Sequence, residues 1–313
     1  MSKRSSPRQV NGILLLDKPE GLSSNQALQV VRRAFNAAKA GHTGNLDVAA
    51  SGLLPLCLGE ATKVCGFLLD SNKRYHAEIQ LGQTSTTGDR EGEITTTGPT
   101  IERSTAEIEH ALHGFRGTIS QVPPMYSALK RGGQPLYKLA RQGIEVEREA
   151  RQLNIHELRL VHHTGSRLGL DISCSKGTYI RSLAISLGEV LGCGAYLAGL
   201  RRVQAGPFEL INAHSCELFA TRKYRPEDYD ELLLPVDAAL KEVPRVNLNE
   251  CDATHLRLGQ AVLLRDELPG PGVVRVYSSE QIFLGMGTLD VNGVLAPKRL
   301  MSTTAQRKVD NFA

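Results

Sequence analysis

The stretch GHTGNLDVAASG, residues 41–52, sets one acidic side chain, Asp47, among small and polar residues. Gly41, Gly44 and Gly52 permit backbone conformations that bulkier residues resist, so the stretch is predicted to be a loop. A lone carboxylate held in such an adaptable loop is a candidate nucleophile or base. The alternative is that Asp47 only bonds the amides of its own turn, as loop aspartates commonly do.

Three further side chains could take part in chemistry, and each has a plain structural alternative. Arg181 follows GTY and opens a predicted helix, which is the unfavourable end for a cation. That placement suggests a nearby carboxylate that compensates the charge. Tyr75 lies on the apolar face of a predicted strand, where core packing is its ordinary role, and His42 could simply bridge its own loop.

Hydrophobic patterning predicts the elements that would position these side chains in the N-terminal part. GILLLDKPEG at 12–21 is expected to be a buried strand, followed by a helix capped by Ser23, Ser24 or Asn25. After the loop of Asp47, LLPLCLG is predicted to be a strand and GEATKVCGFLLD a helix. The polar stretch 84–100 is predicted to be a loop.

Two alternating segments predict half-buried strands that frame the rest of the site. They are KRYHAEIQLG, which places Tyr75 inward, and SRLGLDISCS. The second runs into the helix KGTYIRSLAISLGEVLG, which carries Arg181, and AYLAGLRRV resumes as a strand. Strands and helices mix without a strict βαβ repeat, so the fold class is expected to be α+β.

The pattern of apolar residues changes from about Val246 onward. GQAVLLRD, GVVRVYS, QIFLGMG and GVLAPKRL read as four closely spaced short strands, which predicts a small all-β unit. The chain is therefore divided into residues 1–245, residues 246–305 and a frayed polar tail at 306–313.

Composition narrows the class of protein. No apolar stretch approaches the ~20 residues that span a bilayer, and the N-terminus lacks the apolar block of a secretory signal. The six cysteines form no CxxC pair, which favours buried free thiols in a reducing cytoplasm. No metal-ligand spacing, GxGxxG or GxxxxGK[ST] motif occurs, so no metal and no cofactor are expected. The adjacent pair His162 and His163 is interpreted as part of a surface strand.

Positive charge gathers in one segment. Residues 116–151 carry seven basic and three acidic side chains, a local charge of +4 (7 − 3), with Tyr126 and Tyr137 between them. Basic residues interleaved with aromatic ones suit a polyanion that presents phosphates and bases. A solvated basic face with no ligand is the alternative.

Together these residues resemble a known family. GHTGNLDVAASGLLPLCLGEATK is similar to the active-site motif of the TruB family of pseudouridine synthases, in which the aspartate of G-x-L-D-x-x-A-[ST]-G is catalytic. That aspartate corresponds to Asp47. Further blocks agree in the same order, at 12–25, 70–89, 122–143 and 174–202. The β-rich end resembles the small RNA-binding PUA domain that often follows this catalytic domain.

The resemblance implies a catalytic domain with a mixed, largely antiparallel sheet flanked by helices, then a PUA-like barrel. It implies an isomerase that converts the uridine at position 55 in the TΨC loop of tRNA to pseudouridine after flipping it out of the stack. No cofactor, membrane or protein partner is implied, and a monomer in the cytoplasm that binds the T-arm is expected.

Roles for individual residues follow from the same resemblance. Asp47, Arg181 and Tyr75 would be catalytic, with Arg181 paired to Asp47 and lowering the pKa of that carboxyl. The substrate would contact His42, Tyr75, Tyr179 and Leu200. Residues 124–151 would form a mobile, thumb-like insert that closes over the RNA arm.

The chain departs mildly from the family pattern. Many members carry threonine at the position of Asn45 and proline at that of Val48, and the second change loosens the backbone of the loop. Two rival functions share these motifs: a guide-dependent synthase of a ribonucleoprotein, and an RNA-folding factor without activity. The thumb-like insert argues against the first, and the intact Asp47, Tyr75 and Arg181 argue against the second.

Overall fold

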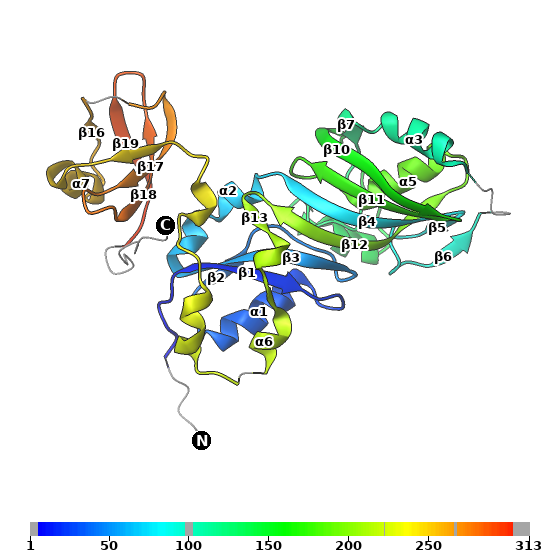
Figure 1. The fold of residues 1–313 in the computed structure, drawn as a ribbon, viewed down its shortest axis with the longest axis horizontal. Coiled ribbons are helices and arrows are strands. Elements are labelled where there is room, and N and C mark those ends of the chain that lie inside the picture. Colours follow the sequence, from blue (N-terminus) through cyan, green and yellow to red (C-terminus); the bar gives the residue numbers. More distant parts are fainter. Residues whose placement is uncertain (1–5, 98–102, 222, 266–267, 303–313) are drawn as a thin grey trace.

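The protein is described by a computed structural model that covers residues 6–97, 103–221, 223–265 and 268–302. Its main body is built on a 10-stranded sheet in the order β14-β1-β3-β12-β4-β11-β10-β7, with β2 paired to β3 and β13 to β12 (Figure 1). The strands are β1 (Gly12–Lys18), β2 (Ala40–His42), β3 (Ala50–Leu58), β4 (Lys73–Leu81), β7 (Gly117–Gln121), β10 (Arg151–Thr164), β11 (Arg167–Cys174), β12 (Ala195–Ala205), β13 (Phe208–Glu209) and β14 (His214–Ser215). Within this sheet only the pairs β1–β14 and β3–β12 run parallel. The expected α+β class with a largely antiparallel sheet is confirmed.

Two groups of helices cover different halves of the sheet (Figure 1). Helices α1 (Ser24–Ala34) and α6 (Cys216–Ala220) bury apolar side chains against β1 and β3, whereas α3 (Thr105–His113) and α5 (Ile180–Val190) pack on β4, β10 and β11. Ser23 caps α1 through a reciprocal bond with Gln26, as predicted for one of three candidate residues. In β4 the predicted alternation holds, because Tyr75, Ala77, Ile79 and Leu81 are buried while their neighbours are more exposed.

Three expectations for the loops and short helices are wrong. The predicted loop 41–52 is shorter than expected, because β2 extends to His42 and β3 begins at Ala50. Residues 59–70 form a 3₁₀ helix (Gly59–Lys63) and a separate short helix α2 (Cys65–Leu69), which are broken at Val64. Val64 is drawn into a tertiary contact described below, and this contact overrides the helical spacing. Within 84–97, β5 (Gln83–Ser85) pairs with β6 (Ile94–Thr96), a hairpin whose polar residues gave no alternating signal. The remainder of the predicted loop, 98–100, lies outside the described residues.

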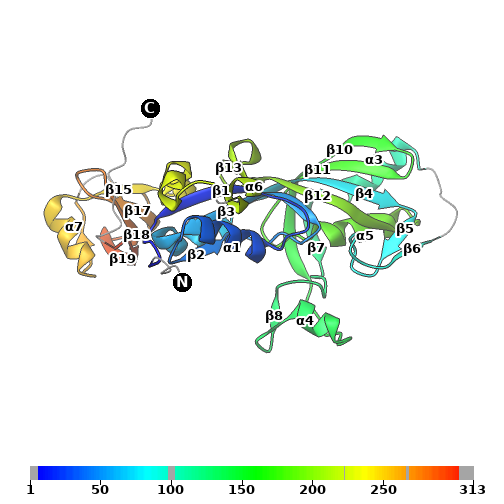
Figure 2. The same cartoon turned by 90° about the horizontal axis from the view of Figure 1, so that it is seen from below.

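The basic insert projects from the sheet (Figure 2). It holds a small hairpin, β8 (Lys130–Arg131) with β9 (Gln134–Pro135), and helix α4 (Leu136–Arg141). Its two stems are strands β7 and β10, which close at the pair Gln121 and Arg151. The insert therefore leaves the main body at one narrow neck.

The C-terminal unit is a curled five-stranded sheet in the order β15-β17-β18-β19-β16, as expected for a PUA-like domain. Its elements are β15 (Arg245–Asn247), α7 (Glu250–Arg257), β16 (Val262–Leu263), β17 (Gly272–Tyr277), β18 (Phe283–Leu289) and β19 (Val294–Leu300). The four predicted strands are present, but sequence reasoning missed β15 and α7. Strand β15 has only three residues, and α7 is a polar helix capped by Asn249.

An apolar contact joins this unit to the main body. Val64 and Leu240 pack with Tyr277, Phe283 and Met286 of the C-terminal sheet. The Lys63 ammonium also donates a hydrogen bond of 2.8 Å to the carbonyl of Leu300. The predicted frayed tail at 306–313 lies outside the described residues.

All six cysteines are free, but not all are buried. Cys57, Cys174, Cys193 and Cys216 are buried and Cys65 is half-buried, whereas Cys251 is exposed on α7, contrary to expectation. His162 and His163 lie on β10, as predicted. Within the described ranges, no helix has the length and apolar character needed to cross a membrane.

Candidate active site

Hydrogen bonds hold the loop of Asp47 in place. The Ser24 hydroxyl accepts from the Leu46 amide at 2.8 Å and donates to the Leu46 carbonyl at 3.0 Å, and Ser24 is fully buried. The Val48 carbonyl accepts from the Gly21 amide at 2.9 Å. The loop is thus tied to the start of α1 on both sides of Asp47, which supplies restraint where the family's usual proline is absent.

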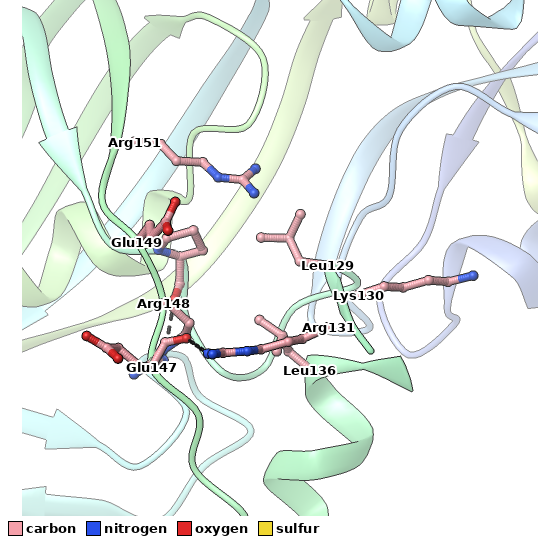
Figure 3. Close-up of a pocket in the computed structure, with 9 residues that line it drawn as sticks. Leu129, Lys130, Arg131, Leu136, Glu147, Arg148, Glu149 and Arg151 are labelled. Atoms are coloured by element: carbon pink, nitrogen blue, oxygen red, sulfur yellow. Dashed lines mark hydrogen bonds between the residues drawn. The ribbon is translucent and has the colours of Figure 1, made fainter. Parts of the chain in front are cut away.

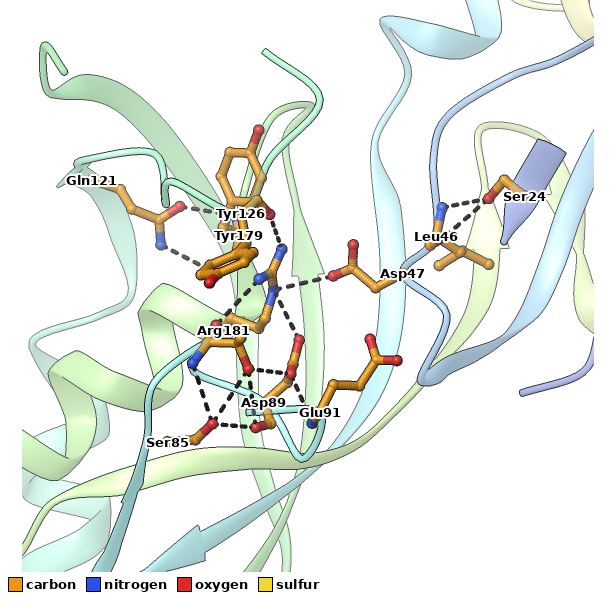
Figure 4. Close-up of polar contacts among 11 residues, drawn as sticks. Ser24, Leu46, Asp47, Ser85, Asp89, Glu91, Gln121, Tyr126, Tyr179 and Arg181 are labelled. Carbon is orange, nitrogen blue, oxygen red and sulfur yellow. Dashed lines mark hydrogen bonds and ion pairs between the residues drawn. The ribbon is translucent and has the colours of Figure 1, made fainter. Parts of the chain in front are cut away.

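Arg181 is the centre of the site (Figure 4). It is the second residue of α5, and its side chain is 5% exposed. Its Nε lies 3.1 Å from a carboxylate oxygen of Asp47 and 3.5 Å from one of Asp89. The guanidinium also donates to the carbonyls of Thr87 at 3.2 Å and Tyr126 at 2.6 Å. The position of Arg181 predicted one compensating carboxylate, and the structure shows two, those of Asp47 and Asp89.

Asp89 is a buried acid that sequence reasoning missed. One of its carboxylate oxygens accepts from the Thr87 hydroxyl at 2.6 Å and from the Glu91 amide at 3.0 Å, while the other faces Arg181. Asp89 follows Gly88, which has φ +80. An acid beside a glycine in a polar loop was the available signal.

The pKa of Asp47 is raised overall, although Arg181 lowers it as expected. Although 38% of the side chain is exposed, the protein around the carboxyl desolvates it, and this is the largest effect on its pKa. The Arg181 charge opposes the rise, the negative charge of Asp89 adds to it, and the ammonium of Lys18 opposes it. Desolvation thus outweighs the ion pair.

A cavity of about 270 Å³ opens beside this ion pair. Its walls include Asp47 and Arg181, and of the predicted substrate contacts they include Tyr75, Tyr179 and Leu200. Tyr75 is 9% exposed, and burial raises the pKa of both tyrosines. Five of the six predicted site residues therefore meet at one cavity.

His42 is the sixth, and it does not line this cavity. It lies on β2, and its Nδ1 is buried without a hydrogen-bond partner among the described residues. Burial lowers the pKa of His42, and the nearby Arg202 charge lowers it further. Its contact with a substrate remains a prediction.

Three other polar side chains near the site were not anticipated. Lys18 is fully buried, donates to the carbonyls of Pro19 and Leu22, and has its pKa lowered by burial to about 8. Gln121 bonds both the amide and the carbonyl of Tyr179, at 2.8 and 3.0 Å, and so fixes the start of α5. The third is Arg202, which lines the cavity.

A second cavity, of about 370 Å³, lies within the basic insert (Figure 3). Its walls include Lys130, Arg131 and Arg151 beside the apolar Leu129 and Leu136. Arg131 bonds the backbone carbonyl of Glu147, which links the two arms of the insert. Because the Tyr126 carbonyl bonds Arg181, the base of the insert reaches the site of Asp47 directly.

The geometry places an ionisable carboxylate at the wall of a cavity that can hold a planar ring. Asp47 is held beside a buried cation and opens onto a cavity with two aromatic walls. Across the described part of the chain, no cluster of three or more potential metal ligands occurs.

The chain is similar to proteins of one family along almost its whole length. Residues 32–180 match the model described as TruB family pseudouridylate synthase (N terminal domain). Residues 181–241 match the tRNA pseudouridylate synthase B C-terminal domain, and 244–301 match Pseudouridine synthase II TruB, C-terminal.

Two curated relatives illustrate the likeness. The chain is 52% identical over 297 residues to tRNA pseudouridine synthase B of Pseudomonas putida, covering 94% of this chain and 96% of that protein. It is 48% identical over 302 residues to the protein of the same name from Nitrosococcus oceani, covering 96% and 97%.

Solved structures share the fold. The chain matches a chain of the "Crystal Structure of a Cbf5-Nop10-Gar1 Complex" with a TM-score of 0.71 at 23% identity, covering 93% of this chain and 85% of that one. It matches a chain of the "Structure of H/ACA RNP bound to a substrate RNA containing 2'-deoxyuridine" with a TM-score of 0.71 at 21% identity, covering 95% and 87%.

Proposed function

Because the chain belongs to the TruB family of pseudouridylate synthases, we propose that it converts the uridine at position 55 of tRNA to pseudouridine and that Asp47 is the central residue. The observation that carries the proposal is the Asp47–Arg181 ion pair at the wall of a cavity with aromatic sides. The isomerisation detaches uracil from C1′ of the ribose and rejoins it through C5. An ionised aspartate in this place serves attack on C1′, attack on C6 or removal of a sugar proton.

The target base must leave the RNA stack to reach Asp47. The cavity supplies the surface that would receive it: the ring of Tyr75 offers stacking, and Tyr179 and Leu200 complete the walls. Arg181 would hold the Asp47 carboxylate in place throughout. His42 does not line the cavity and would contact a part of the substrate that lies outside it.

The RNA-binding surfaces would lie on the insert and on the C-terminal unit. The insert of residues 124–151 is basic and projects from the sheet beside the site, so it is placed to grip one RNA arm (Figure 2). Residues 246–305 would add contacts farther along the tRNA. The enzyme would act as a monomer without a protein partner, guide RNA or cofactor.

A T-arm hairpin tests this assignment. The hairpin carries [5-³H]uridine, and formation of the new bond at C5 releases the tritium. We expect release from the folded hairpin without guide RNA, and little from the same sequence as an unfolded strand, because RNA of this kind is read through shape and splayed loop bases. EDTA should leave the rate unchanged when monovalent salt maintains the RNA fold.

The outcomes separate the rival functions. Release that appears only after a guide RNA is added would assign the chain to the guide-dependent branch. Tight binding of the hairpin without release under any condition would indicate an RNA-folding factor. Mapping of the modified nucleotide in a full tRNA transcript then checks position 55.

The rate should fall on acidification at a higher pH than an ordinary aspartate would require. The reaction needs the Asp47 carboxylate, so activity is present above its raised pKa and lost as pH falls through it. Asp89→Asn removes a negative charge that raises this pKa, so the acid limb of that variant should lie at lower pH. Single-turnover tritium release from about pH 4 to about pH 8 measures both limbs.

The matched control for this pH profile is Glu91→Gln, an exposed acid on the same loop as Asp89. Its acid limb should coincide with that of the parent. An acid limb of Asp89→Asn at or above the parent's pH would contradict the electrostatic account of Asp47.

Removing two exposed cations from β19 should weaken RNA binding and leave the single-turnover rate unchanged. Lys298 and Arg299 are exposed on the C-terminal unit, which contributes no residue to the walls of the cavity beside Asp47. The double alanine variant should bind tRNA more weakly, with a salt dependence shallower by roughly one unit per lost phosphate contact. The control removes Arg159 and Arg167, two exposed cations on β10 and β11 of the main sheet. Equal affinity of the parent and the β19 variant would exclude this strand from the RNA surface.

A further inference from the structure

Arg202 is a fully buried cation without an acidic partner. It is 1% exposed and is the largest fully buried side chain among the described residues. Within the described residues, no carboxylate lies within 4.0 Å of its guanidinium, in contrast to Arg181 with two and Arg201 with Asp17. Burying a cation without an acidic partner costs free energy of folding. Fold stability therefore does not explain why an arginine occupies this position.

Its position in the sheet supplies that reason. On β12, Arg202 is the register partner of Gly52 on β3 and of Tyr75 on β4. Gly52 has φ +102, and a Cβ there would lie 2.3 Å from the Arg202 carbonyl, so the two backbones touch. Arg202 thus stands between the end of the Asp47 loop and the strand that carries Tyr75.

The guanidinium reaches both ends of that loop. Its Nε donates to the Leu53 carbonyl at 2.7 Å and its Nη2 to the Gly44 carbonyl at 3.4 Å. These two carbonyls flank Asp47, and the side chain also lines the cavity. The positive charge further opposes the rise that burial causes in the pKa of Tyr75.

From these contacts we propose that Arg202 is a positioning residue for the reaction: it spans the loop from Gly44 to Leu53 and thereby sets Asp47 against the ring of Tyr75. This inference rests on the proposed isomerase activity. A planar fork with several donors can bond two carbonyls at once, which a single ammonium cannot do with the same geometry. Ser24 holds the loop at Leu46, between the two carbonyls that Arg202 binds.

Arg202→Met and Arg202→Lys test the proposal. Methionine removes both the charge and the hydrogen bonds, whereas lysine keeps the charge but cannot bond the carbonyls of Gly44 and Leu53 at the same time. We expect a single-turnover rate lower by about 100-fold for methionine, the scale of a misplaced catalytic group, with tRNA affinity close to that of the parent. Lysine should fall between methionine and the parent. Millimolar guanidinium chloride should restore part of the rate of Arg202→Ala.

The control is Arg74→Met. Arg74 neighbours Tyr75 on β4 but pairs with Asp171 and Glu157 outside the cavity, so its loss should leave the rate unchanged. Thermal melting of each variant accompanies the kinetics. An inactive parent would refute the proposed function itself, whereas an active parent with an equally active Arg202→Met would overturn only the positioning role. Loss of folding in both the methionine and the lysine variant would make Arg202 a core residue and also overturn it.

Discussion

Asp47→Asn is expected to bind tRNA like the parent and to release tritium at least roughly 10⁴-fold more slowly, the scale of losing a nucleophile. Asparagine keeps the shape of the side chain but has no negative charge to attack with or to accept a proton. The fold should tolerate the change, because Arg181 retains Asp89 and two backbone carbonyls as partners. Single-turnover kinetics with the T-arm hairpin, together with a binding titration, measure both effects.

A matched control for this variant is Asp171→Asn. Asp171 is also paired with an arginine, Arg74 at 2.8 Å, but on β11 away from the cavity. It undergoes the same loss of charge and should keep the parent's rate. If Asp47→Asn retained substantial activity in a preparation free of parent enzyme, Asp47 would not be the central residue.

Arg181→Met is the second substitution with a large expected effect, and it should reduce both the rate and the stability. It leaves Asp47 and Asp89 facing each other without the cation, and it leaves the carbonyls of Thr87 and Tyr126 without their donor. Breaking a buried pair such as Arg181–Asp89 costs ~3–5 kcal/mol in the free energy of unfolding, because the remaining charge stays buried.

The pH dependence of this variant gives a distinct signature. The Arg181 charge lowers the pKa of Asp47, so its removal should move the acid limb of the rate to higher pH. Arg181→Lys keeps a charge but cannot reach all four partners, and it should show an intermediate loss. Arg159→Met, at an arginine that is 66% exposed, serves as the control. A parent-like kcat and an unmoved acid limb in Arg181→Met would refute the pairing.

Much of the fold follows from local sequence. The alternation in β4 and β11 and the helix of Arg181 depend on neighbouring residues, and they were predicted correctly. The cap of α1 is Ser23, one of the three residues predicted as candidates. The family resemblance likewise placed six residues in one site, and the structure brings five of them to one cavity: Asp47, Tyr75, Tyr179, Arg181 and Leu200. The sixth, His42, does not line that cavity. The misses have little local signal: β15 is short, α7 is polar, and the β5–β6 hairpin lies in a Thr-rich stretch.

Sequence alone therefore determined the type of fold and the candidate site residues, because these are encoded in periodicity and in a compact motif. Only the tertiary structure decided that Arg181 meets Asp89 as well as Asp47, and that Arg202 lies buried between the loop of Asp47 and Tyr75. It also decided the net direction of the pKa shift of Asp47, because the desolvation of this carboxyl outweighs the lowering by Arg181 that the sequence suggested. The physical reason is that pairing across a sheet and loss of solvent around a carboxyl depend on segments that are distant in the chain, and no local pattern records their distances.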